Sequence, residues 1–127
     1  MSRGCKKLTL ASDAEKLTVK PFSKEEIHFE VMEENSYLEW EFEMKNKDID
    51  FSLLFRRESS EYFEPIEIIP KQRIDANDEP QKGCFKCEKA GIYTMIFDNT
   101  YSWIYSKEVY YRAEIKGLRN DEIYSFT

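Results

Sequence analysis

The chain has 127 residues, about the length of one domain, and carries 19 basic against 25 acidic residues, for a net charge of −6. A domain of this length buries about two-thirds of the surface of its unfolded chain and folds without disulfide staples. The charge argues against general attraction to nucleic acid or anionic lipid, so we expect no nucleic-acid partner. No apolar run approaches the roughly 20 residues of a membrane-spanning helix, and residues 1–10 lack the apolar core of a signal peptide.

The three cysteines, Cys5, Cys84 and Cys87, are odd in number and poorly spaced for a disulfide framework. This usage favours a reducing, cytoplasmic compartment. Residues 1–14 show no periodicity and are predicted to be a flexible linker or a cloning remnant. Two short strands are predicted next from alternating apolar residues, namely Leu17 and Val19, then, after Pro21, Ile27, Phe29 and Val31.

The clearest alternation lies in residues 37–45. One face carries Leu38, Trp40, Phe42 and Met44, and the other carries Glu39, Glu41, Glu43 and Lys45. After a polar turn, residues 49–55 repeat the apolar pattern, which is typical of a half-buried antiparallel sheet. We expect these two segments to pair as a hairpin that brings Arg56 and Arg57 near the acidic face, with each ion pair contributing about 0.2–1 kcal/mol.

The middle of the chain predicts shorter strands. Residues 66–69 form one, which Pro70 is expected to end because proline cannot donate to a sheet ladder. Residues 71–82 are expected to be a long surface connection, followed by a brief strand with Phe85 and Cys87 facing inward. Gly91 suits a turn position with a positive φ angle.

Residues 91–98 and 107–116 read as two strands that face each other across an aromatic loop, in which Asp98, Asn99 and Thr100 turn the chain by bonding its backbone. Residues 117–127 lack a pattern and are expected to be a frayed tail. Seven or eight short strands without a convincing helix predict an all-β, antiparallel β-sandwich of the jelly-roll type over residues 15–116.

The strings FDNTYSW and SKEVYYR, within residues 97–112, resemble the C-terminal strands of the GOLD (Golgi dynamics) domain, a β-sandwich of membrane-traffic proteins. Residues 36–57 and 67–80 resemble earlier parts of that domain, so the resemblance covers roughly residues 16–116. It implies the cytosolic type of GOLD domain, as found at the C-terminus of CRAL-TRIO lipid-transfer proteins.

Residues that could support catalysis or metal binding are few. His28, the only histidine, alternates toward solvent, and Cys84 and Cys87 face opposite ways on an extended strand, without a second ligand pair for zinc. Asp48 and Asp50 could suggest a sugar hydrolase, but a strand end offers no evident cleft. The acidic residues 75–79 lack the glycine and distal glutamate of a calcium loop. We therefore predict no catalytic residues, no metal and no cofactor.

The aromatic corner is the best candidate for a binding site. Tyr101, Trp103 and Tyr105 could anchor a partner, with Arg56 and Arg57 among the polar residues at the rim. The sequence leaves open whether these aromatics bind a partner or fill the end of the sandwich.

These features predict a non-catalytic protein-interaction module in contact with an unidentified protein partner, and the resemblance implies that the module belongs to a larger intracellular trafficking or lipid-transfer protein. The resemblance adds an expectation of cytoplasmic location with peripheral contact at Golgi or endosomal membranes. The alternative is a jelly roll that binds a lipid headgroup or a carbohydrate beside Trp103.

Overall fold

The computed structural model describes residues 14–44, 48–57, 64–75 and 80–117. Within these ranges the chain forms eight strands and no helix. The strands are β1 (Glu15–Val19), β2 (Lys24–Val31), β3 (Ser36–Met44), β4 (Ile49–Arg56), β5 (Ile66–Ile74), β6 (Gln81–Cys87), β7 (Gly91–Asp98) and β8 (Lys107–Lys116). It follows that none of the described residues forms a helix that could cross a membrane.

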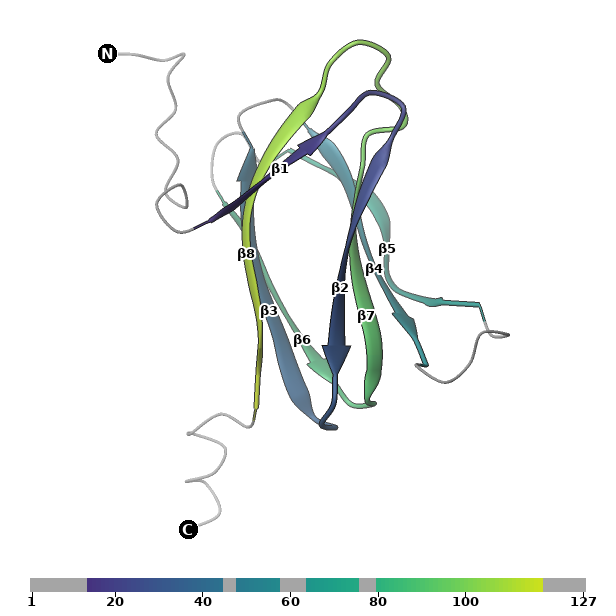
Figure 1. Ribbon diagram of the computed structural model, residues 1–127, viewed down its shortest axis with the longest axis vertical. Coiled ribbons are helices and arrows are strands. Elements are labelled where there is room, and N and C mark those ends of the chain that lie inside the picture. Colours follow the sequence, from purple (N-terminus) through teal and green to yellow (C-terminus); the bar gives the residue numbers. More distant parts are fainter. Residues whose placement is uncertain (1–13, 45–47, 58–63, 76–79, 118–127) are drawn as a thin grey trace.

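The strands form two four-stranded antiparallel sheets that lie face to face (Figure 1). Sheet A has the order β1-β8-β3-β6 and sheet B the order β2-β7-β4-β5. Most connections therefore cross from one sheet to the other, as in a jelly roll, and only β4 and β5 are consecutive neighbours within a sheet. The predicted all-β sandwich is confirmed.

The predicted hairpin of residues 37–45 with residues 49–57 is wrong, because β3 and β4 lie in different sheets. Both edges of β3 are occupied, by β6 and β8. Phe42 of β3 instead packs across the sandwich on Phe51, with ring centroids 5.4 Å apart, and on Phe97 at 5.0 Å. Alternation identified the apolar face of each strand. It does not show whether the next strand in the sequence pairs with it in the same sheet or packs against it from the other sheet.

The prediction that Pro70 ends a strand is also wrong, because β5 continues to Ile74. β5 is an edge strand, and its pairing with β4 is irregular around Leu53. Proline is tolerated at such a position because the missing N–H need not serve a neighbour. The predicted connection over residues 71–82 is correspondingly shorter, since β6 begins at Gln81.

The core lies between the sheets and contains both predicted apolar faces. Its fully or nearly fully buried members include Leu38, Trp40, Phe42, Met44, Ile49, Phe51, Leu53, Phe55, Tyr93, Met95, Phe97 and Val109. Glu43 departs from the prediction of a wet acidic face, since it is completely buried, beside Tyr110 of β8. The predicted tails fall mostly outside the described residues, so the flexibility of residues 1–14 and 117–127 stays a prediction.

Candidate functional site

Asn99 fixes the loop between β7 and β8 (residues 99–106) onto the turn between β1 and β2 (residues 20–23). Its side chain is completely buried, and its Nδ2 donates hydrogen bonds to the carbonyls of Val19 at 3.1 Å and Tyr105 at 2.9 Å. Its backbone N–H donates to the carbonyl of Ser23 at 2.8 Å. One side chain thus ties together segments about 80 residues apart in the chain.

Asp98 and Thr100 close the start of the same loop, as the sequence predicts. One Asp98 carboxylate oxygen accepts hydrogen bonds from the Thr100 N–H at 2.8 Å and the Thr100 hydroxyl at 2.6 Å. Burial raises the pKa of Asp98, but the Thr100 bonds and the charge of Lys71 outweigh it, so the pKa lies below its ordinary value. The loop therefore leaves the sheet in a defined direction.

Tyr101 belongs to a partly buried polar cluster and is itself only partly accessible. Its hydroxyl donates to the Asp48 carboxylate and accepts from the buried Lys107 ammonium at 3.1 Å. The Arg73 guanidinium lies 3.6 Å from the centre of the Tyr101 ring, which is a cation–π contact. Burial, followed by the Asp48 hydrogen bond, raises the pKa of Tyr101 above its ordinary value. Tyr101 therefore stabilises the base of the loop.

The next part of the loop projects outward. Trp103 is 77% exposed, Ile104 74% and Tyr105 68%. Phe22, in the adjoining turn, is 63% exposed and stacks on Trp103 with ring centroids 6.4 Å apart, while its N–H donates to the carbonyl of Ser102. We call Phe22, Trp103, Ile104 and Tyr105 the aromatic end; it lies at the top of the sandwich in Figure 1.

Phe22 was not singled out from the sequence. It adopts φ = +61°, a conformation that bulky side chains rarely occupy. The sequence contained a local signal for its exposure, because Phe22 directly follows Pro21 in a turn and therefore lies outside the alternation that places apolar side chains in the core.

Arg56 and Arg57 lie far from the aromatic end. Arg56 is opposite Ile92 at one end of β7, whereas the aromatic loop follows Asp98 at the other. The six-residue separation along the strand corresponds to about 20 Å. The structure thus brings Trp103 and Tyr105 together with Phe22, and separates them from the two arginines. A binding role for any of these residues stays a prediction.

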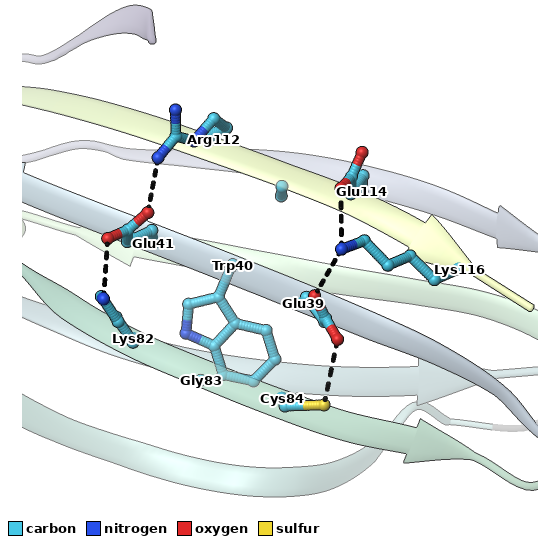
Figure 2. Close-up of a pocket in the computed structure, with 10 residues that line it drawn as sticks. Glu39, Trp40, Glu41, Lys82, Gly83, Cys84, Arg112, Glu114 and Lys116 are labelled. Carbon is cyan, nitrogen blue, oxygen red and sulfur yellow. Dashed lines mark hydrogen bonds and ion pairs between the residues drawn. The ribbon is translucent and has the colours of Figure 1, made fainter. Parts of the chain in front are cut away.

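A shallow groove of about 750 Å³ runs over the outer face of sheet A (Figure 2). One wall is Glu41 between Arg112 at 2.7 Å and Lys82 at 3.5 Å. The other wall is Glu39, which lies 3.1 Å from Lys116 and 3.9 Å from the Cys84 sulfur. The Arg112 hydrogen bond holds the pKa of Glu41 below its ordinary value. Opposite charges in both walls largely cancel, so the groove has no strong preference for ligand charge.

The floor of this groove depends on a glycine. Trp40 lies opposite Gly83 in the pairing of β3 with β6, and its indole covers the position where a side chain would begin. A Cβ atom at Gly83 would lie 2.2 Å from two indole atoms. The close approach of the ring to the backbone requires glycine at this position.

The remaining candidates for chemistry have structural contacts. His28 Nδ1 lies 2.8 Å from the Thr94 hydroxyl on the outer face of sheet B. Asp50 is held by Arg73 at 2.7 Å. Cys84 is exposed and Cys87 buried, so the two thiols face opposite ways as predicted. No metal-ligand cluster occurs among the described residues; residues 76–79 of the acidic loop lie outside them.

Comparison with known proteins identifies the class of domain. Residues 59–115 match a family model described as Golgi-dynamics membrane-trafficking. The chain is 33% identical over 86 residues to the human FYVE and coiled-coil domain-containing protein 1, and 34% identical over 114 residues to the human Golgi resident protein GCP60. These alignments cover 67% and 64% of this chain. The resemblance seen in the sequence is confirmed: the sandwich is a GOLD-type domain.

The chain corresponds to only a small part of these relatives, 6% of the first and 22% of the second. The mouse GCP60 protein matches in the same way, at 32% identity. The relation therefore concerns the domain, and the activities of the longer proteins are not carried over by it.

Proposed function

We propose that this GOLD-type domain is a non-catalytic interaction module of a larger membrane-trafficking or lipid-transfer protein, and that it contacts a protein partner through the aromatic end. The supporting observation is the exposure of Trp103, Ile104 and Tyr105 on a loop that Asn99 anchors. Large aromatic side chains on a rigid base lose little conformational freedom on binding, and they dominate the energetics of interfaces.

The proposed location is cytoplasmic, with peripheral contact at Golgi or endosomal membranes. It is supported by the family description and by the name of the Golgi resident relative. A place after a CRAL-TRIO domain belongs to the same proposal and depends on the resemblance alone.

The aromatic end suits a protein partner better than a small ligand. A carbohydrate or lipid-headgroup site is a recess that encloses most of its ligand with a few convergent polar groups. Trp103 instead stands out from the surface at 77% exposure. The described hollows around Trp40, Phe85 and His28 are lined by other residues.

The test is quantitative affinity capture from cell lysate with the wild-type domain and with Trp103→Ala. We expect Trp103→Ala to lower the captured amount of a specific partner at least tenfold, while changing the free energy of unfolding by less than about 0.5 kcal/mol, because the side chain is exposed.

Met32→Ala is the matched control, since Met32 is 75% exposed but follows β2 at the end of the sandwich away from the aromatic loop. We expect it to capture the same partners as the wild type. The assignment to the aromatic end would be refuted if both variants lost the partner to the same extent, or if neither variant lost it.

A further inference from the structure

Among the described residues, the sandwich is open between the edge strands β5 and β6, at a distance from the aromatic end. A hollow of about 390 Å³ lies there, and its apolar walls come from both sheets: Phe55 and Tyr93 of the core, and the partly buried Ile68 and Phe85. Its mouth carries Lys86, Glu88 and Lys89. An apolar hollow that opens between two strand edges can accept a side chain of an added strand.

β6 directs part of its backbone toward this open side. The Cys87 carbonyl accepts a hydrogen bond from the Asn35 N–H at 2.7 Å, so Cys87 faces β3. In an antiparallel ladder, successive residues direct their N–H and C=O groups to opposite sides. Lys82 and Lys86 therefore direct theirs away from β3, toward the side on which the described residues place no further strand of sheet A.

β6 is the more suitable of the two edges that border the hollow. Its pairing with β3 runs without a shift from Ser36–Cys87 to Phe42–Gln81. The pairing of β5 contains two register shifts, and β5 includes Pro70, which lacks an N–H. Bulges and prolines hinder the addition of a strand, whereas a regular ladder permits it.

The charge of β6 indicates the chemistry of its partner. The strand QKGCFKC carries two lysines and no acidic residue, within a chain of net charge −6. Lys82 lies 3.5 Å from Glu41, which offsets its charge, whereas Lys86 lies at the mouth of the hollow. Both lysines are exposed on the outer face. A strand added beside them would gain from acidic residues on its outer face, since cross-strand pairs of opposite charge attract.

From these observations we infer that β6 is a second docking site, which binds an extended peptide of a partner protein by strand addition. The peptide alternates apolar residues, one of which enters the hollow beside Phe85, with acidic residues, one of which lies near Lys86. This site is independent of the aromatic end and goes beyond the proposed function.

The experiment selects a phage-displayed library of random twelve-residue peptides on the 127-residue protein, followed by affinity measurement on the enriched peptides. The blocking variant is Lys86→Pro, which removes an N–H that points away from β3 and toward the added strand. We expect alternating acidic and apolar peptides, a loss of affinity of at least tenfold in Lys86→Pro, and unchanged affinity in Trp103→Ala.

Two further measurements make the result independent of the folding of Lys86→Pro. N-methylation of alternate peptide amides should abolish binding in one register and leave it intact in the other. Lys86→Gln, which keeps the N–H, should weaken binding severalfold and reduce its dependence on salt.

Failure to enrich any peptide would overturn the inference, as would binding that survives both Lys86→Pro and N-methylation. Peptides that lose affinity in Trp103→Ala but not in Lys86→Pro would also overturn it, while supporting the aromatic end as a docking site. The two proposals can therefore fail separately.

Discussion

The burial of some residues follows from the alternation of apolar and polar side chains along their own strand, whereas the environment of others depends on the neighbouring strand. Trp40 is buried as its place in residues 37–45 predicts. Glu43 shares the alternation of Glu39 and Glu41 but is completely buried, beside Tyr110 of the neighbouring strand β8. Gly83 could not be interpreted from the sequence, since its requirement comes from an indole on another strand.

Gly83→Ala should destabilise the domain by about 1–3 kcal/mol, because the new methyl group would overlap the Trp40 ring and force either the ring or the strand to move. Urea denaturation measures the change in the free energy of unfolding. Gly117→Ala is the control, because a Cβ atom added at Gly117 would meet no other atom within 4 Å, and it should change that free energy by less than about 0.5 kcal/mol. Equal effects would show that the indole does not lie on Gly83.

The strands were easier to predict than their pairing. The segments 91–98 and 107–116 coincide with β7 and β8, because turn residues bound each of them clearly. The prediction of a β3–β4 hairpin was wrong, since a jelly roll pairs strands that are distant in sequence. The prediction that Pro70 ends a strand was wrong because edge strands tolerate proline.

At the candidate site the sequence identified the aromatic loop, but not which of its rings are exposed. Tyr101 and Trp103 have the same spacing pattern, yet one is held by Asp48 and the other projects into solvent. The distance of Arg56 from this loop also depends on the sheet topology, which alternation does not encode.

The loop between β7 and β8 should lose its anchor in Asn99→Asp. The aspartate would replace the donating Nδ2 with an oxygen that faces the carbonyls of Val19 and Tyr105. We expect the free energy of unfolding to fall by about 3 kcal/mol, because buried polar groups would lose their hydrogen bonds and a charge would be buried. Chemical denaturation at neutral pH checks this value.

Ser102→Ala is the control for that prediction, since it removes only the Ser102 hydroxyl, which donates an exposed hydrogen bond to the Tyr105 carbonyl in the same loop. It should change the free energy of unfolding by less than about 0.5 kcal/mol. A similarly small change in Asn99→Asp would mean that Asn99 does not hold the loop.

For the whole molecule, stability should depend on acid pH. The pKa values of Glu41, Asp48 and Asp98 lie below their ordinary values in the folded chain. For Asp48, burial raises the pKa, but hydrogen bonds from Tyr101 and Lys107 outweigh that effect. These carboxyl groups therefore bind protons more weakly in the folded than in the unfolded chain.

The stabilisation from these groups is complete above the unfolded pKa values, near pH 4, and is lost as the pH falls through the lower folded values. Urea unfolding at pH 7, 5, 4 and 3 should show a decline concentrated below about pH 5. Asp48→Asn should flatten part of that decline. A free energy that stays constant down to pH 3 would contradict the cluster around Tyr101.

The architecture joins two features of different origin. The antiparallel sandwich follows from alternation along the strands, whereas both proposed docking sites lie at its margins: at the loops beside Asn99 and along the edge strand β6. The ends of a sandwich can vary in sequence while the core is retained, as is general for loops on a rigid scaffold.

Photo-crosslinking in cells tests the central claim most directly, with p-benzoylphenylalanine placed at Trp103 in one variant and at Met32 in another. We predict a discrete protein adduct from position 103 and none from position 32, since only the first lies in the aromatic end. Adducts of equal yield from both positions, or an adduct from position 32 alone, would contradict the account.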